Sequence, residues 1–462
     1  MSVQLRKPAA ATTPIHAVDA QGFEAAAAAL PLDERRWLHT LGFKGAPDSF
    51  ALLPGKDGRL AAVWAGVHGA AHPYALSLLP RALPEGSYRL AEGPLALDAQ
   101  AAAMSWQLGS YAFERYRKRP RGAATLQLPA AAGSRRGLVL AESIALVRDL
   151  VNTPAEDMGP AQLAAAAQAL AKAHGARFTQ IVGDELLKKD LPAIHAVGRA
   201  AEHPARAPRL IELEWGRPRD PRVTLVGKGV CFDSGGLDIK SADGMRLMKK
   251  DMGGAANVLG LARMIMALEL PLRLRVLIPA VENSIAGNAL RPGDVLRTRR
   301  GIHIEIGNTD AEGRVILCDA LALAAEAKPA LLIDLATLTG AARVALGPQL
   351  PALFCRDTAL ARTLVDRGGE LHDPLWHLPL WADYHDRIES DIADIVNTGK
   401  GPMAGAVTAA LFLADFVPPA LPWLHVDLFA WNDAARPGRP VGGEAQVLRT
   451  LLDHLEQRVA SR

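Results

Sequence analysis

Short apolar runs alternate along the second half of the chain with longer segments that carry apolar residues at helical spacing. The apolar runs predict strands at 222–227, 272–281, 303–306, 330–336 and 422–429. Helices are predicted at 138–152, 160–174, 255–268, 314–328, 407–416 and 444–459. This order of elements predicts an α/β domain with a mainly parallel sheet that helices flank on both faces.

The chain before these elements has a different composition. Its first 116 residues or so are rich in alanine and predict a smaller α/β domain, to which no role is assigned. From 117 to 137, a basic run, two prolines and small residues interrupt the periodic pattern and predict a linker. Since 462 residues exceed the roughly 150 of a typical domain, we predict an N-terminal α/β domain at 1–130 and a larger domain at 131–462.

The overall composition narrows the class of protein. With 49% hydrophobic and 22% charged residues, the chain has the composition of a globular protein. Its 52 Lys and Arg against 49 Asp and Glu leave a net charge of +3, which predicts neither a nucleic-acid partner nor a membrane surface as partner. The three cysteines form no disulfide framework, and the N-terminus has no apolar signal segment. We therefore expect a soluble cytoplasmic protein.

Polar residues gather in the segment that follows the first predicted strand. In a mainly parallel sheet, active sites lie beyond the carboxyl ends of the strands, here after residues 227, 282, 306 and 336. The segment from 227 to 260 is rich in glycine and holds four charged residues suited to a site: Lys228, Asp233, Lys240 and Asp251. Taken alone, Asp251 is better suited to capping the helix that follows it than to binding a cation.

A second group of charges stands just before a predicted helix. Asp310, Glu312 and Arg314 occupy alternate positions, and alternate residues of an extended segment point to the same side. Two carboxylates that face the same way repel each other unless a cation lies between them. Arg314 alone would leave Asp233 and Asp251 uncompensated if all share one cleft, so a divalent metal ion is the simpler partner.

The charges of these residues balance those of two metal ions. Three aspartates and one glutamate carry four negative charges, as many as the positive charges of two divalent ions. Carboxylate oxygens suit Mn²⁺, Mg²⁺ or Zn²⁺, and two such ions can bridge and activate one water molecule. One lysine could lose its proton and bind a metal, while the other stays charged and polarises a carbonyl. The sequence therefore predicts metal-assisted hydrolysis.

The same residues lie within segments that carry a family resemblance. They belong to VGKGVCFDSGG, IKSADGM, KKDMGGAA and NTDAEGR, and DLATLTGA follows. These segments closely resemble the leucyl (cytosol) aminopeptidase family, the M17 metallopeptidases. The resemblance runs from about residue 138 to the C-terminus and implies a catalytic aminopeptidase domain at 131–462. It implies a cytoplasmic, homohexameric metalloaminopeptidase that releases N-terminal amino acids, above all leucine and other apolar residues, from short peptides.

The resemblance also implies a role for each residue. Two divalent ions per subunit, Mn²⁺ or Zn²⁺, are implied to bind to Lys228, Asp233, Asp251, Asp310 and Glu312. Lys240 matches the lysine that polarises the scissile carbonyl, and Arg314 matches the arginine that holds a bicarbonate ion as general base. The pocket for the first side chain is implied to be lined by Met248, Thr337, Leu338, Gly340 and residues 403–408. Asp238 departs from the family pattern two residues before Lys240, where its carboxylate would lower the local potential.

Other functions compete with this one. The segment Asp233-Ser234-Gly235-Gly236 is reminiscent of a chymotrypsin-type serine nucleophile, but the chain has neither the preceding glycine nor a matching histidine motif. A non-catalytic or DNA-binding regulatory protein of the same fold is a further alternative. The non-catalytic alternative predicts damage among the seven polar site residues, and all seven are intact. The near-neutral charge gives DNA binding no support.

Overall fold

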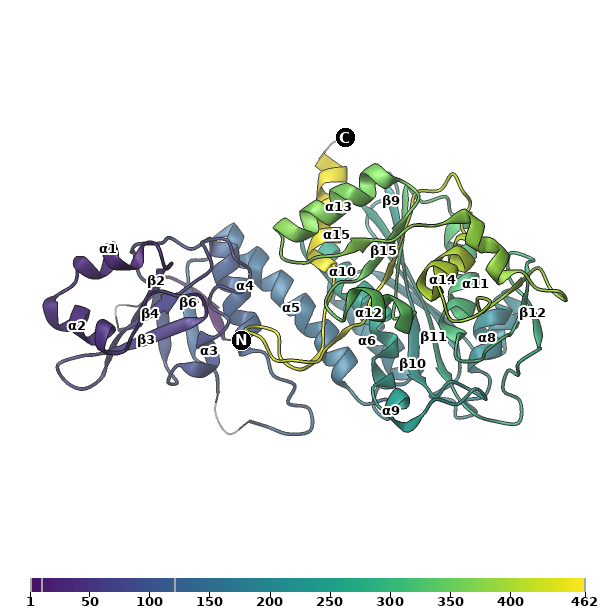
Figure 1. The fold of residues 1–462 in the computed structure, drawn as a ribbon, viewed down its shortest axis with the longest axis horizontal. Helices are drawn as coiled ribbons and strands as arrows, with labels where there is room; N and C mark the ends of the chain where they lie inside the picture. The colour runs from purple at the N-terminus through teal and green to yellow at the C-terminus, as the bar shows by residue number, and fades with distance from the viewer. Residues whose placement is uncertain (1, 10, 120–121, 461–462) are drawn as a thin grey trace. The chain divides into compact units, whose positions relative to one another are not determined.

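The strands pair into two large sheets, and each sheet belongs to its own compact unit (Figure 1). The computed structural model describes residues 2–9, 11–119 and 122–460. The first unit holds Met1–Ala145 and Ala434–Val441, and the second holds Leu146–Asp433 and Gly442–Arg462. Each unit has a hydrophobic core of its own.

The first unit is built on a six-stranded sheet with the order β1-β6-β5-β2-β4-β3. Neighbouring strands are parallel, except that β3 and β4 are antiparallel. The strands are β1 (Val3–Leu5), β2 (Thr13–Val18), β3 (Ser49–Pro54), β4 (Leu60–Gly66), β5 (Ser87–Leu90) and β6 (Thr125–Leu128). The helices are α1 (Phe23–Ala28), α2 (Leu32–Thr40), α3 (Leu79–Ala82) and α4 (Ala99–Ser110). This unit is the smaller α/β domain that the sequence predicts.

The linker predicted at 117–137 is wrong in part. β6 lies within this segment and pairs in parallel with both β1 and β5, which makes it an inner strand of the first sheet. The helix α5 (Ala132–Asn152) also begins before the segment ends. Pro120 and Arg121 of the same segment lie outside the described residues. The sequence does not predict β6, because this strand is only four residues long and follows a basic, proline-containing run.

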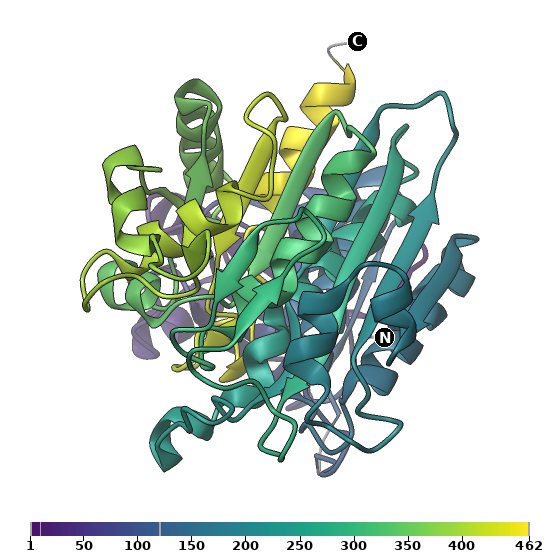
Figure 2. The ribbon, with the colours of Figure 1, turned by 90° about the vertical axis from the view of Figure 1, so that its right-hand side faces the viewer.

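The second unit contains a nine-stranded sheet, in which eight strands have the order β16-β15-β18-β14-β9-β11-β8-β7 and β10 pairs with β11. The central strands β18, β14, β9 and β11 are parallel, whereas β7, β8 and β15 join antiparallel. The strands are β7 (Arg177–Val182), β8 (Arg209–Trp215), β9 (Arg222–Gly227), β10 (Gly229–Asp233), β11 (Arg273–Asn283), β14 (Leu331–Ala336), β15 (Ala352–Cys355), β16 (Trp376–His377) and β18 (Trp423–Asp427). Figure 2 shows these strands fanned out by the usual twist of a sheet.

Helices cover both faces of this sheet (Figure 1). One side carries α6 (Pro160–His174), α10 (Gly253–Ala267) and α15 (Leu448–Ala460), and the other carries α8 (Pro192–Gly198), α11 (Glu312–Glu326) and α14 (Gly405–Ala414). Further helices are α7 (Glu185–Lys188), α9 (Ala242–Met245), α12 (Gly340–Leu346), α13 (Thr358–Glu370) and the 3₁₀ helices η1 (Met248–Met252) and η2 (Ala382–Ile388). In the described ranges, no helix has the length and apolar character needed to cross a membrane. The predicted fold class is confirmed: a mainly parallel sheet flanked by helices, preceded by a smaller α/β domain.

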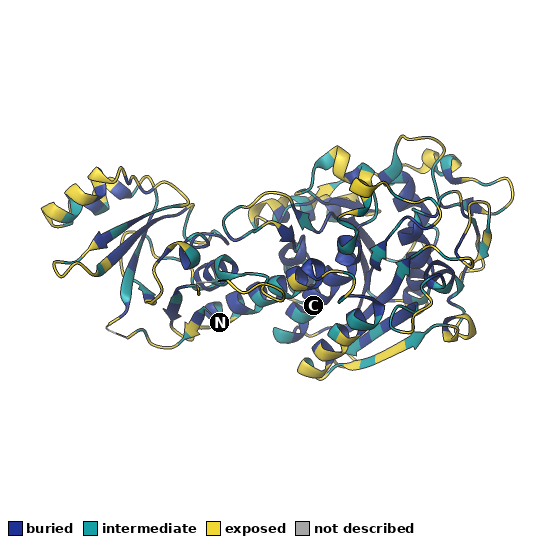
Figure 3. Ribbon diagram, turned by 90° about the horizontal axis from the view of Figure 1, so that it is seen from below, coloured by how far each residue is buried: buried dark blue, intermediate teal, exposed yellow. Residues whose placement is uncertain are grey.

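The central strands of the second sheet are buried on both faces. Every residue of β14 and β18 is buried, and Figure 3 shows the interior of this unit in dark blue. Strands covered on both faces appear in a sequence as continuous apolar runs, and the strand predicted at 222–227 coincides with β9. The edge strand β7 has no fully buried residue, and its mixed sequence RFTQIV predicts no strand.

Two strands near the candidate site differ from the sequence prediction. β10 follows β9 after a single residue, Lys228, and pairs in parallel with the far end of β11. The segment after residue 227 is therefore first a strand and only then a loop. The strand predicted at 303–306 is β13 (His303–Glu305), which lies outside the main sheet, between β12 (Val295–Arg297) and β17 (Ile395–Val396). A short pair, β19 (Trp431–Asn432) and β20 (Gly442–Gly443), completes the unit.

Candidate active site

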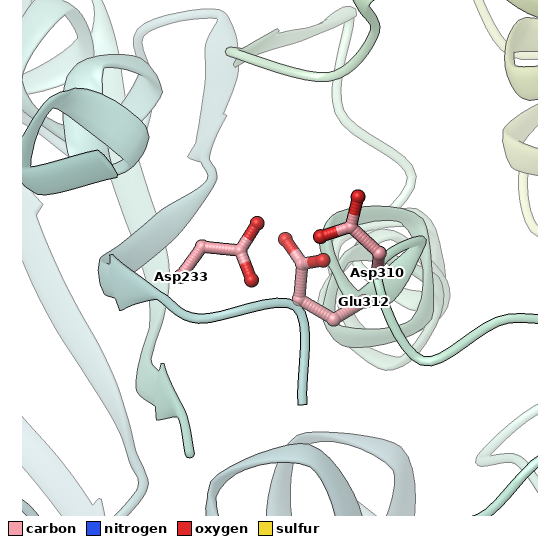
Figure 4. A group of neighbouring side chains, drawn as sticks. All are labelled: Asp233, Asp310 and Glu312. Carbon is pink, nitrogen blue, oxygen red and sulfur yellow. The ribbon is translucent and has the colours of Figure 1, made fainter. Parts of the chain in front are cut away.

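Three carboxylates converge at the carboxyl end of β10. Asp233 is the last residue of β10, Asp310 lies in the turn before α11, and Glu312 is the first residue of α11. One carboxylate oxygen from each lies within 4.8 Å of the other two. Figure 4 shows Asp233 facing Asp310 and Glu312 across the space between β10 and α11. The structure therefore brings together residues that are almost 80 positions apart in the sequence.

The convergence of Asp310 and Glu312 has a different cause from the one predicted. The segment is not extended, because Ala311, with φ −105° and ψ 39°, is the N-cap of α11 and Glu312 already belongs to the helix. The alternate-position argument is therefore wrong for Asp310, Glu312 and Arg314. The two carboxylates lie together because a tight turn leads directly into the N-terminus of a helix, where backbone N–H groups favour negative charge.

Lys240 lies between two of these carboxylates. Its Nζ is 2.8 Å from Asp233 Oδ2 and also forms an ion pair with Asp310 Oδ1. Burial lowers the pKa of Lys240, but Asp233 and Asp310 outweigh burial, so its pKa is raised and the side chain stays charged. The additional carboxylate of Asp238 takes no part in this ion pair. It accepts hydrogen bonds from Thr309 N at 2.7 Å and Thr309 Oγ1 at 3.1 Å.

Lys228 holds a second pair of carboxylates. Its buried Nζ lies 2.7 Å from Asp251 Oδ2 and 3.0 Å from Glu312 Oε1, and it donates to Thr337 O at 2.8 Å. Its long side chain passes under the start of α11, where a Cβ on Gly313 would lie 2.5 Å from Lys228 Cε. Burial lowers the pKa of Lys228, but the surrounding carboxylates raise it more. Glycine at position 313 is therefore needed for this lysine to reach the site.

Asp251 does not cap the helix that follows it, so the capping interpretation is wrong. The N-cap of α10 is Met252, and no side chain caps that terminus. Asp251 lies in η1, and its Oδ1 accepts a hydrogen bond from Thr337 Oγ1 at 2.8 Å. Its carboxylate is thus turned toward Lys228 and Glu312 rather than toward the backbone of α10.

The residues present fit divalent metal ions. Glu312 Oε2 is buried and, within the described ranges, has no hydrogen-bond partner. Burial and the negative charge of Asp233 raise the pKa values of Glu312 and Asp310. Crowded, desolvated carboxylates of this kind are stabilised by a cation. Carboxylate oxygens together with one lysine amine form a donor set that such ions accept.

A cavity of about 420 Å³ adjoins these charges. It is lined by the four residues predicted for the substrate pocket, Met248, Thr337, Leu338 and Gly340, and by Gly405 from the segment 403–408. Lys240 and Arg314, the two predicted catalytic residues, line the same cavity. Arg314 is only 8% exposed, burial lowers its pKa to about 10, and its Nε has no partner among the described residues. All eleven predicted site residues therefore lie in one region.

Sequence analysis missed several residues of this region. Asn283, the last residue of β11, donates from Nδ2 to Asp233 Oδ1 at 2.9 Å and to Thr309 O at 3.0 Å, and so fixes both sides of the site. Its position at the end of a predicted strand could have identified it. Lys250, Arg343 and Phe429 also line the cavity, and sequence analysis assigned no role to any of them. The serine alternative gains no support, since Ser234 Oγ donates to Asn283 O at 2.7 Å.

Comparison with known proteins assigns the chain to a family. The model of the cytosol aminopeptidase family, catalytic domain, matches residues 145–452. The chain belongs to the cytosol aminopeptidase family. The model of the M17 aminopeptidase N-terminal domain matches residues 13–129. The predicted family and enzyme class are confirmed: the protein is a metal-dependent aminopeptidase that acts on peptides, and a non-catalytic or DNA-binding role is not favoured.

Members of the cytosol aminopeptidase family match most of the chain. The probable cytosol aminopeptidase of Syntrophotalea carbinolica is 42% identical over 382 residues, 79% of this chain and 76% of the relative. The crystal structure of the cytosol aminopeptidase from Coxiella burnetii is 47% identical, with 99% of both chains covered and a TM-score of 0.94. The bottromycin maturation enzyme BotP, in complex with Mn, is 35% identical over 97% of this chain and 100% of its own, with a TM-score of 0.86.

Proposed function

We propose that this aminopeptidase releases leucine and other apolar residues from the N-termini of short peptides by means of two divalent metal ions per subunit, Mn²⁺ or Zn²⁺. The observation that supports this most is the convergence of four carboxylates and two lysines beside one cavity. The domain at 131–462 is proposed to carry the catalysis. The domain at 1–130 receives no role.

The ligands proposed for the metal ions are Lys228, Asp233, Asp251, Asp310 and Glu312. The ions would supply the Lewis acidity that lowers the pKa of a water molecule and polarises a carbonyl. Among the ligands, Lys228 has to give up a proton, because the carboxylates beside it hold its pKa high. Binding of metal is therefore expected to release protons, and the affinity for metal is expected to rise with pH.

Lys240 and Arg314 are proposed to act on the substrate from the cavity wall. Lys240 keeps its charge and would stabilise the negative charge that develops on the oxygen of the scissile carbonyl. Arg314 is proposed to hold a bicarbonate ion that serves as general base. A buried guanidinium with an unpartnered Nε, in the described part of the chain, is suited to a small planar anion.

The free α-amine of the substrate is proposed to bind a metal ion, which would explain why only the first residue is removed. The first side chain would then lie against Met248, Thr337, Leu338 and Gly340. Met248 and Leu338 offer apolar contacts to leucine or a similar side chain. An acetylated N-terminus has an amide nitrogen in place of the amine, cannot bind the metal in this way, and is expected to be rejected.

The assembly and location are proposed from the family resemblance. We expect a homohexamer in the cytoplasm, with access restricted to short peptides. Light scattering of the purified protein measures the mass in solution, and a hexamer is expected at six times 49.1 kDa. A protein that is monomeric and active at every concentration would contradict this proposal.

Hydrolysis of leucine p-nitroanilide tests the proposed function directly. We expect turnover with Mn²⁺, loss of turnover in the presence of a chelator, and recovery when the metal is restored. The N-acetylated substrate is expected not to react. Turnover without metal, or of the acetylated substrate, would contradict the proposed chemistry. A metal-loaded protein without any turnover would return attention to the non-catalytic alternative.

A further inference from the structure

Two cations on one wall of the cavity have no part in the proposed catalysis. Lys250 comes from η1 and is only 7% exposed, and Arg343 comes from α12 and is exposed. Both line the cavity. Lys250 Nζ lies 4.8 Å from the centre of the Phe429 ring, and Arg343 Cζ lies 5.0 Å from the same centre. One aromatic ring therefore supports both positive charges.

Neither cation has a carboxylate partner. Within the described ranges, no carboxylate oxygen lies within 4.0 Å of Lys250 Nζ or of the Arg343 guanidinium. The nearby Asp427 is engaged elsewhere: its Oδ1 accepts from Leu338 N at 2.9 Å, and its Oδ2 accepts from Thr339 Oγ1 at 2.6 Å. A buried ammonium without a counter-ion is costly, and an anion that enters the cavity relieves that cost.

The origin of the two residues indicates which part of a substrate they meet. The short helix η1 supplies both Met248 and Lys250, and α12 supplies both Gly340, its first residue, and Arg343. Met248 and Gly340 are proposed to line the pocket for the first side chain. The two cations therefore belong to the same wall, so an anion that reaches them would be part of that first side chain.

We propose that Lys250 and Arg343 form an anion-binding subsite that admits glutamate or aspartate as the first residue of the peptide. This inference rests on the proposed function, because it assumes that the first side chain enters this cavity. The aliphatic part of an acidic side chain would contact Met248, as is proposed for leucine, and its carboxylate would meet the ammonium and guanidinium groups. The enzyme would thus accept two chemical classes of first residue in one pocket.

Paired substrates of equal shape test the charge. Glutamyl and glutaminyl p-nitroanilides differ by one charge and have nearly the same volume, so the ratio of their kcat/KM values isolates the carboxylate. We expect the metal-loaded wild type to favour the glutamyl substrate. Lys250→Met keeps an unbranched side chain against Phe429 but removes the charge, and should lower this ratio by at least about tenfold. Arg343→Gln, at an exposed position, should lower it by about threefold.

Lys249→Met is the matched control. Lys249 is the neighbouring lysine, but its Nζ donates to Asn152 O at 2.7 Å and lies 5.6 Å from the centre of the Trp431 ring. It does not line the cavity. We expect the ratio of kcat/KM for the glutamyl and glutaminyl substrates in Lys249→Met to equal the ratio in the wild type. A wild type that favours the glutaminyl substrate, or an unchanged ratio in a folded Lys250→Met protein, would overturn the proposal. If Lys250→Met does not fold, the ratio in Arg343→Gln decides.

Two further measurements separate this proposal from its alternatives. In one alternative, the cations bind the C-terminal carboxylate of a dipeptide. Lys250→Met would then lower the ratio of leucyl-glycine to leucyl-glycinamide hydrolysis and leave the ratio for the glutamyl and glutaminyl p-nitroanilides unchanged. This result would overturn the proposal. Calorimetric titration with L-glutamate and L-glutamine needs no turnover. Tighter binding of glutamate, lost in Lys250→Met, would support the subsite even if the enzyme fails to cleave leucine p-nitroanilide. Equal binding of the two amino acids by the wild type would overturn it.

Discussion

The second unit contains two kinds of buried carboxylate. Asp373 is surrounded by backbone donors, because its oxygens accept from the N–H groups of Val447, Arg449 and Thr450 at 3.1, 2.7 and 3.3 Å, where α15 begins. Glu312 has only Lys228 beside Oε1, and its Oε2 has no partner within the described ranges. A carboxylate that the backbone satisfies stabilises the fold, whereas one that depends on cations is available to a ligand.

Replacement of Glu312 should have the largest effect on activity. Glu312→Ala removes a proposed metal ligand, so kcat/KM for leucine p-nitroanilide is expected to fall by at least about a thousandfold. The fold should persist, because no backbone group loses a partner. Circular dichroism and a cooperative thermal transition would verify this, and full activity in the variant would refute the proposed site.

Glu326→Ala is the matched control at the other end of the same helix. Glu326 is exposed, and its Oε1 forms an ion pair with Arg299 Nε at 2.6 Å. Exposed ion pairs contribute little to stability, about 0–1 kcal/mol. Activity within about twofold of the wild type is expected. A loss as large as that of Glu312→Ala would mean that α11 responds to any lost carboxylate, and the comparison would fail.

Replacement of Asp373 should give the opposite result. Asp373→Ala leaves the N–H groups at the start of α15 without their acceptor, and the free energy of unfolding is expected to fall by about 2–4 kcal/mol. The folded fraction should keep its activity, because Asp373 does not line the cavity. Scanning calorimetry measures the lower melting temperature. Asp366→Ala, at an exposed position of α13, should change stability by less than about 0.5 kcal/mol.

Much of the fold of the second unit can be predicted from the sequence, because strands that are buried on both faces appear as continuous apolar runs. β9 and α6 have the predicted bounds. β9 is a continuous apolar run. α6 begins at Pro160 and ends before Gly175, and the φ of Gly175, +66°, is one that only glycine adopts easily. β7 and β10 are not predicted, since the first is a mixed edge strand and the second is short and rich in polar chemistry. The assignment of β13 to a separate sheet depends on long-range pairing with β17, which periodicity does not encode.

The residues of the candidate site likewise fall into two groups, those that the sequence predicts and those that it does not. Residues such as Asp233, Asp310 and Glu312 are predictable because they cluster in short polar segments after strands and resemble family motifs. Lys250 stands beside Asp251 in KKDMGGAA, but neither it nor Arg343 follows a pattern that indicates a binding role. Their common position over Phe429 depends on three segments that only the folded chain brings together. The geometry of the Asp310 turn likewise follows from where α11 begins.

The smallest predicted effect concerns Asp319, a buried carboxylate of α11 that, like Asp373, accepts hydrogen bonds from backbone N–H groups. Its oxygens accept from Ala193 N at 2.8 Å and Arg299 N at 2.9 Å, yet burial raises its pKa to about 6. Since the unfolded value is lower, the folded state binds more protons between about pH 4 and 6, and the stability contributed by Asp319 is lost as the pH rises through this window. Asp319→Asn removes this titration. We therefore expect the melting temperature of the wild type, minus that of the variant, to decrease by a few degrees from pH 4 to pH 6. A constant difference would mean that backbone donors alone set the protonation of this carboxylate.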